Sequence, residues 1–236
     1  MKIGVVSDVH GDIAALDSAL GHLHRLGCDP ILCAGDLLDI EPSGEEVVQR
    51  LKSEGAICIR GNHERWALDK HSPEGQAFSS GTDLSPESLV FLAALPAYWS
   101  AELEGVRVAM WHARPGSDME SIHAETTGPA LRRRLLDEAD VDVLIVGHTH
   151  DAFVLPAGKG KIVNPGACCS KIYALKFTGS LVVLDGFRVA TFGVLELPSK
   201  RFSVFRAVDG EQVHGLAGKG DLFATLIPVP SKRPGG

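Results

Sequence analysis

Five apolar runs of the sequence are each followed at once by side chains that can bind a metal ion. In chain order they deliver Asp8 and His10, then Asp36, then Asn62 with His63 and Glu64, then His112, and finally His148 and His150. Imidazole, carboxylate and amide oxygen, without a thiolate, suit divalent ions such as Mn²⁺, Fe²⁺, Zn²⁺, Co²⁺ or Ni²⁺ more than a structural zinc site. We expect Mn²⁺ first among these.

The number of candidate ligands favours two ions. A tetrahedral ion takes four ligands, and the sequence offers Asp8, His10, Asp36, Asn62, His112, His148 and His150. Two cations held roughly 3.5–4 Å apart require a shared carboxylate. Asp36 is the natural bridge, because Gly35 lets the chain turn sharply beside it.

Each of these residues also has a simpler interpretation. A single histidine after a strand is more often structural than a ligand, and an aspartate there is commonly a helix N-cap. The joint pattern argues against that interpretation, because five of the ten histidines fall at strand ends beside Asp or Asn. The remaining five, which we assign to surface or structural roles, are His22, His24, His71, His123 and His214.

The elements that would position these side chains alternate between strand and helix. Residues 2–9 form an apolar run, residues 13–26 have apolar residues at helical spacing, and a second apolar run follows, which is typical of an α/β protein. We expect further helices over 45–53, 85–95 and 127–139, and strands at 56–60, 106–111 and 141–146. In open α/β sheets, ligands gather outside the carboxyl ends of the strands, so distant residues can converge there.

The later part of the chain has a different pattern. From residue 153 on, short apolar segments separated by Gly, Pro and Asn indicate a second sheet made largely of antiparallel strands. We expect one domain over 1–236, in which 66–96 is a helical, substrate-shaping insertion and 195–236 a C-terminal extension of unassigned role.

Composition limits the class of protein. With 44% apolar and 22% charged residues the composition is that of an ordinary globular protein. The first residues hold too short an apolar run for a signal peptide, and no run approaches about 20 apolar residues, so we expect the protein in the cytoplasm and off the membrane. A net charge of −7 argues against nucleic acid as a partner. The exception, Arg132 to Arg134, reads as a solvated helix face. Five cysteines without CxxC spacing indicate buried thiols, including the adjacent Cys168 and Cys169.

Taken together, the motifs resemble those of the calcineurin-like metallophosphoesterase superfamily, closest to its small bacterial and archaeal members. They are D-x-H at 8–10, G-D-x-x-D at 35–39, G-N-H-E at 61–64, a lone His112, and G-H-x-H at 147–150. The resemblance runs from residue 5 to about residue 166. It implies a four-layer α-β-β-α sandwich with mixed sheets and a two-metal site between them.

The resemblance also implies roles for single residues. Asp8, His10 and His150 would hold one ion, Asn62, His112 and His148 the other, and Asp36 would lie between. His63 would approach the phosphate and stabilise or protonate the leaving oxygen. Asp39 and Glu64 would orient imidazoles, and Arg60 and Arg114 would reach the substrate phosphate or form ordinary salt bridges.

The implied activity is hydrolysis of a phosphate mono- or diester, on a small-molecule or nucleotide substrate, by a hydroxide shared between the two ions. Asp39 is followed by Ile40-Glu41, which lacks the phosphate-binding arginine of the Ser/Thr protein phosphatases, so that branch is not expected. Ala113 follows His112 where the family usually has Gly, and His63 stands where small phosphodiesterases often have Cys, which leaves the choice between mono- and diester open. The alternatives are a nuclease and a catalytically silent scaffold for partner proteins.

Overall fold

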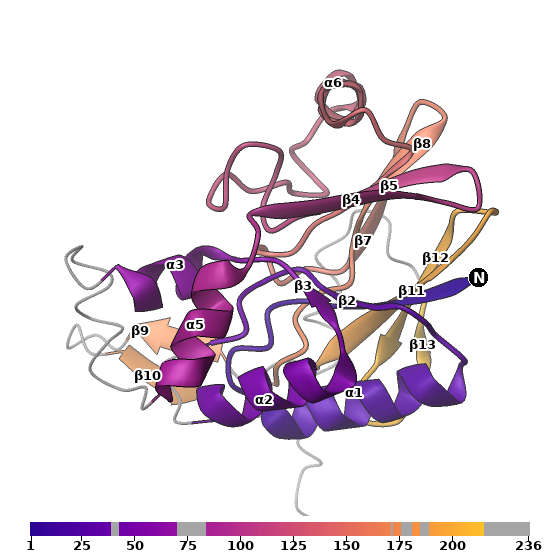
Figure 1. Ribbon diagram of the computed structural model, residues 1–236. Coiled ribbons are helices and arrows are strands. Elements are labelled where there is room, and N and C mark those ends of the chain that lie inside the picture. The colour runs from indigo at the N-terminus through magenta and orange to yellow at the C-terminus, as the bar shows by residue number, and fades with distance from the viewer. Residues whose placement is uncertain (39–42, 70–83, 171, 176–180, 185–188, 215–236) are drawn as a thin grey trace, which may run out of the picture.

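The computed structural model describes residues 1–38, 43–69, 84–170, 172–175, 181–184 and 189–214. Four layers follow one another in space: helices, a six-stranded sheet, a five-stranded sheet and an outer helix (Figure 1). This is the expected α-β-β-α sandwich with two mixed sheets. None of the helices in this part of the chain has both the length and the apolar character to cross a membrane.

The first sheet has the strand order β13-β12-β11-β1-β2-β3. Its parallel half consists of β1 (Lys2–Val6), β2 (Ile31–Cys33) and β3 (Ile57–Cys58). Its antiparallel half consists of β11 (Thr191–Glu196), β12 (Arg201–Arg206) and β13 (Gln212–Val213), with β11 paired to β1. The described residues of the stretch 195–236, which the sequence led us to regard as an extension, therefore largely complete this sheet.

The second sheet has the order β4-β5-β6-β8-β7. Strands β5 (Val106–Trp111), β6 (Val143–Ile145) and β8 (Gly160–Asn164) are parallel, and β4 (Tyr98–Leu103) and β7 (Phe153–Ala157) are antiparallel at the edges. The strands from residue 153 on are largely antiparallel to one another, as expected, but the expectation that they form one second sheet was wrong. Only β7 and β8 of that region join this sheet, while β9 (Ile172–Leu175) and β10 (Leu181–Leu184) form a separate pair and β11 lies in the first sheet.

Five helices lie in the described ranges. They are α1 (Ile13–Arg25), α2 (Gly44–Glu54), α3 (Asn62–Leu68), α5 (Pro86–Ala94) and α6 (Pro129–Ala139). Helix α6 begins two residues later than expected because Gly128 is its N-cap and Pro129 takes the first turn, where no N–H partner is needed. Of the expected insertion at 66–96, the end of α3 and all of α5 are helical, and 70–83 lies outside the described residues.

Three apolar clusters separate the four layers. Leu16, Leu20 and Leu23 of α1 pack with α2 against one face of the first sheet. A second cluster fills the space between the sheets, and a third joins the second sheet to Leu135 and Leu136 of α6. Side chains of β1 belong to two different clusters because successive residues of a strand point to opposite faces of the sheet. Ile3 and Val5 face the second sheet, while Val6 faces the helices. All five cysteines are buried free thiols.

Candidate metal centre

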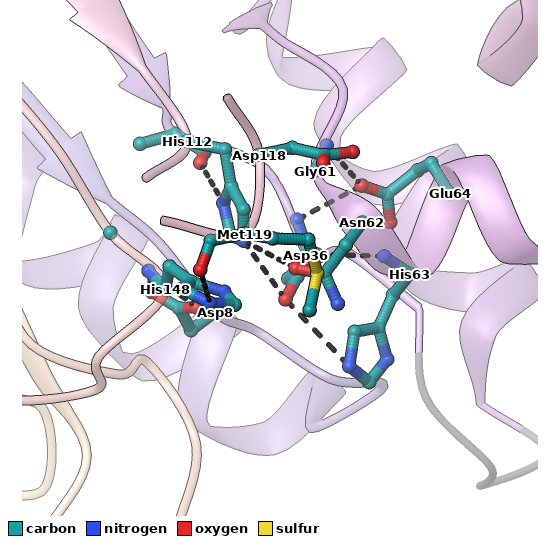
Figure 2. Close-up of polar contacts among 12 residues, drawn as sticks. Asp8, Asp36, Gly61, Asn62, His63, Glu64, His112, Asp118, Met119 and His148 are labelled. Atoms are coloured by element: carbon teal, nitrogen blue, oxygen red, sulfur yellow. Dashed lines mark hydrogen bonds and ion pairs between the residues drawn. The ribbon is translucent and has the colours of Figure 1, made fainter. Parts of the chain in front are cut away.

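The candidate ligands lie just beyond the carboxyl ends of five strands, as the sequence predicted. Asp8 and His10 follow β1, Asp36 follows β2, and Asn62 opens the helix after β3. From the second sheet, His112 follows β5, and His148 and His150 follow β6. Because both sheets end on the same side of the molecule, these side chains meet between them. Figure 2 shows five of them, Asp8, Asp36, Asn62, His112 and His148.

The backbone of these loops is unusual. Five of the candidate ligands have positive φ angles, a region that residues with a Cβ rarely adopt: 53° at Asp8, 50° at His10, 55° at Asp36, 67° at His148 and 62° at His150. Hydrogen bonds between the loops hold them there. The backbone N–H of Asp8 donates to Gly35 O and that of His10 donates to Asp36 O, both at 3.0 Å. The loops after β1 and β2 therefore form one unit.

One group of ligand atoms comes from Asp8, His10 and His150. The Nε2 atoms of the two imidazoles lie 2.8 Å apart, and Asp8 Oδ1 lies 3.4 Å from His150 Nε2 and 4.0 Å from His10 Nε2. Two ring nitrogens and a carboxylate oxygen aimed at one point form a donor set that a divalent cation fits. The resemblance had assigned these three residues to a single ion.

A second group surrounds His112. Its Nε2 lies 3.1 Å from Asp36 Oδ2 and 3.0 Å from Asn62 Oδ1, and the ring of His148 is centred 5.1 Å away. Asp36 shares ligand distance with His112 and His148 and also with His10 and His63. It is thus placed between the two groups, where a bridging carboxylate has to be.

Backbone carbonyls fix three of the imidazoles from behind. Ala34 O lies 2.8 Å from Nδ1 of His112, Leu38 O lies 3.3 Å from Nδ1 of His10, and Met119 O lies 3.1 Å from Nε2 of His148. A ring nitrogen that donates to a carbonyl leaves the other nitrogen free of its proton and able to bind a cation. For His148 the inward nitrogen is therefore Nδ1.

Burial and mutual charge set the ionisation of the site. Burial raises the pKa of Asp8 to about 7, and the charge of Asp36 acts in the same direction. Burial opposes ionisation of Asp36 too, but the charges of His112 and His63 outweigh it and hold the pKa of this carboxyl well below its usual value. Burial disfavours the charged form of His112, yet Asp36 raises the pKa of His112 to about 10. A proton on His112 thus occupies the place where a cation would neutralise Asp36.

Glu64 has a role different from the one expected. It was expected to orient imidazoles, but its fully buried carboxylate accepts hydrogen bonds from four backbone N–H groups, those of Asp36, Leu37, Leu38 and Gly61, at 2.8–3.1 Å. It therefore joins the loop after β2 to the start of α3. The signal in the sequence is its position three residues after the N-cap Gly61, where a capping-box glutamate reaches back.

His63 lies inside the site. Its Nε2 is 3.8 Å from Asp36 Oδ2, its ring is centred 4.6 Å from that of His10, and its backbone N–H donates to Asp36 Oδ1 at 3.0 Å. The ring also faces Trp66 at 4.9 Å. Since His63 stands within ligand distance of His10 and Asp36, its assignment as a group that acts on the substrate and not as a ligand stays a prediction.

The remaining sequence candidates lie outside the cluster or outside the described residues. Arg114 forms an ion pair with Glu120, so the salt-bridge interpretation holds for it. Arg60 is half-buried and its backbone N–H donates to Pro96 O at 2.8 Å. Asp39 is not among the described residues. On α1, His24 pairs with Glu54, which fits the surface role expected for it.

Gly147, the first residue of the G-H-x-H motif, supports the site together with Asn164, which no pattern in the sequence marks. The buried Asn164 side chain donates to Gly147 O at 2.8 Å and accepts from Gly166 N at 2.8 Å, which ties β8 to the loop that carries His148 and His150. A Cβ at Gly147 would clash with Ser7 Oγ and approach Asp8. Only glycine lets this loop lie so close to the loop after β1.

The sequence profile of the calcineurin-like phosphoesterase superfamily domain matches residues 1–186, and the chain belongs to that family. The uncharacterized protein MJ0912 of Methanocaldococcus jannaschii is 26% identical over 188 residues, which cover 70% of this chain and 75% of that protein.

Several solved structures share the fold, and two of them illustrate the likeness. One is a hypothetical protein, PH1004, of Pyrococcus horikoshii, with a TM-score of 0.69, 13% identity and coverage of 95% of this chain and 97% of its own. The other is a metallophosphoesterase of Sphaerobacter thermophilus, with a TM-score of 0.63, 21% identity and coverage of 87% and 88%.

Proposed function

We propose that this chain is a metal-dependent phosphoesterase that hydrolyses a mono- or diester of phosphate on a small molecule or nucleotide. The proposal rests on one observation, that two groups of donor atoms meet at Asp36. Hydrolases that cleave phosphate esters with two cations hold both of them with a shared carboxylate. The family supports the same reaction class.

The two donor groups would hold one cation each. Asp8, His10 and His150 would take the first, Asn62, His112 and His148 the second, and Asp36 both. When bound, two divalent cations, with Mn²⁺ the first expectation, would supply Lewis acidity toward the phosphoryl oxygens and lower the pKa of a water molecule. The residues themselves hold the donor atoms in place, since carbonyls and Glu64 fix the rings and loops before substrate arrives.

His63 is the candidate for handling the leaving group. Its imidazole stands beside Asp36, and 16% of the side chain is exposed. An imidazole in this place can stabilise or protonate the oxygen of the departing alcohol. A net charge of −7 makes an extended nucleic acid the less suitable substrate.

Metal titration and hydrolysis assays together test the proposal. We expect the metal-free full-length chain to take up two Mn²⁺ ions and then to hydrolyse p-nitrophenyl phosphate or its diester. Asp36→Asn and His150→Ala should abolish metal-dependent hydrolysis, and His63→Ala should slow turnover with both ions retained. The exposed His24 on α1 supplies a control, His24→Ala, which should behave as wild type.

Each outcome decides a separate part of the proposal. Full activity of the Asp36→Asn protein would remove that residue as the bridge, and loss of an ion from the His63→Ala protein would make His63 a ligand. Uptake of one ion, or of none, would contradict the two-ion site. A wild-type protein that binds no metal and cleaves no ester would favour a scaffold for partner proteins instead.

A further inference from the structure

The segment between β5 and α6 returns to the site by a compact loop, residues 113–121. Reciprocal backbone hydrogen bonds between Arg114 and Ser117, at 3.0 and 3.1 Å, close its turn. The Ser117 hydroxyl then accepts from the backbone N–H groups of Met119 and Glu120, at 3.2 and 3.0 Å. These bonds give the loop a fixed shape of its own, and this shape presents the Met119 carbonyl to His148 at 3.1 Å (Figure 2).

A side-chain contact joins this loop to helix α3. Arg65 Nε donates to Asp118 Oδ2 at 2.7 Å and Arg65 Nη2 donates to Asp118 Oδ1 at 3.2 Å. Such bidentate pairs restrict both distance and orientation more than a single contact does. Asp118 directly precedes Met119, so the pair acts on the residue whose carbonyl faces His148.

Arg65 lies on the helix that already serves the site in three other ways. Successive residues of a helix point about 100° apart, so four neighbours in α3 face four directions. Asn62 faces His112, His63 faces Asp36, Glu64 braces the loop after β2, and Arg65 extends to the 113–121 loop. Figure 2 shows Asp118 and Met119 in one view with Asn62, His63 and Glu64.

We propose that Arg65 and Asp118 are positioning residues, which fix the 113–121 loop so that the Met119 carbonyl holds the His148 ring with Nδ1 toward the cations. The catalytic part of this inference rests on the proposed function, but the effect on the His148 ring does not. The pair is partly exposed, with 42% and 29% of the two side chains open to solvent, so it adds little to overall stability. Its loss should therefore change the site and leave the fold intact.

The state of the His148 ring gives the first test and needs no metal. Long-range proton–nitrogen spectra of the metal-free, full-length protein report which ring nitrogen carries the proton. We expect the proton on Nε2 in the wild type and a mixture of both tautomers in Arg65→Ala and in Asp118→Ala. An unchanged tautomer in both variants would overturn the proposal, whether or not the protein proves to be a phosphoesterase.

Titration with Mn²⁺ alone gives the second test. Loss of a residue that orients a metal ligand lowers affinity by about 10–100-fold. We expect each single variant to bind Mn²⁺ about ten-fold more weakly at one of the two sites, and the double variant to lose no more affinity than either single variant. The charge-exchange variant, Arg65→Asp with Asp118→Arg, should recover part of the lost affinity. Additive losses in the double variant would show that the two residues do not act as a pair.

The control removes a partly exposed ion pair that involves neither the 113–121 loop nor α3. Arg206 of β12 contacts Asp209 through two nitrogens, with comparable exposure, and also pairs with Glu211. Arg206→Ala should keep the wild-type His148 tautomer and Mn²⁺ affinity. Equal changes in Arg206→Ala and Arg65→Ala would mean a general loosening of the fold, and would refute a specific role for Arg65. The melting temperature of Arg65→Ala should stay close to that of the wild type, which separates positioning from folding.

Discussion

Replacing Glu64 by glutamine should destabilise the fold and weaken metal binding together. One carboxylate oxygen accepts from Leu37 and Leu38 and the other from Asp36 and Gly61. Glutamine keeps one oxygen, so whichever way its amide turns, two of the four N–H groups face an NH₂ donor. A buried N–H left without an acceptor costs about 1–3 kcal/mol, which gives about 2–6 kcal/mol for the two.

The free energy of unfolding of a folded domain is only about 5–15 kcal/mol, so this loss is a large part of it. For a chain of this size each kcal/mol lowers the melting temperature by about 2–4 °C, so a fall of about 4–24 °C is expected. Thermal and urea melts of the metal-free protein measure it, and Mn²⁺ titration should show weakened binding because the Asp36 loop is no longer held. Glu46→Gln, at an exposed position in α2, is the matched control. If Glu64→Gln melted with the wild type and bound Mn²⁺ equally well, the bracing role would be refuted.

The other predictions concern a close backbone approach and two ionisation equilibria. Gly147→Ala should abolish Mn²⁺ uptake, because the added methyl group displaces Ser7 and Asp8, while Gly128→Ala, which meets open space, should titrate as wild type. Normal uptake by Gly147→Ala would show that the loops can separate without harm. Mn²⁺ affinity should rise with pH by about ten-fold per unit between pH 7 and 9 and more steeply below 7, because binding displaces protons from His112, with a pKa of about 10, and from Asp8, with a pKa of about 7. Calorimetry at several pH values measures this slope, and a flat profile from pH 6 to 8 would contradict it. Burial opposes ionisation of Glu45, but hydrogen bonds from the start of α5 lower its pKa to about 2, so its stabilising effect is present above pH 4.5 and is lost as the pH falls through about 2. The difference in melting temperature between wild type and Glu45→Gln should therefore be present at pH 7 and absent near pH 2.

The sequence predicted the ligand cluster because its signal is local. Each candidate ligand directly follows an apolar run, and the rule that parallel strands end at one edge of a sheet brings such residues together. The same reasoning failed for β11, whose pairing with β1 joins residues about 190 positions apart and leaves no trace in its own alternation. Strand β4 was also missed, because YWSAEL mixes exposed and partly buried residues at a sheet edge.

The supporting contacts were the least predictable part of the site. The Met119 carbonyl that faces His148 is a backbone atom, which any residue at that position would present, so its role leaves no signature in the amino-acid type. The pairing of Arg65 with Asp118 joins a partly exposed helix position to a loop 53 residues later. Glu64 was predicted to be a supporting residue, but with the wrong partners. The four backbone N–H groups that it accepts from come together only in the folded structure.

Folding and metal binding place opposite demands on the five candidate ligands that have positive φ angles. A residue with a Cβ held in this region costs of the order of 1–3 kcal/mol, and glycine would avoid that cost but would offer no donor atom. A cation that binds only the folded chain returns stability by mass action. We therefore expect the amount of intact protein in a cell to follow the supply of its metal, with starved cells degrading the chain faster than they lose its transcript.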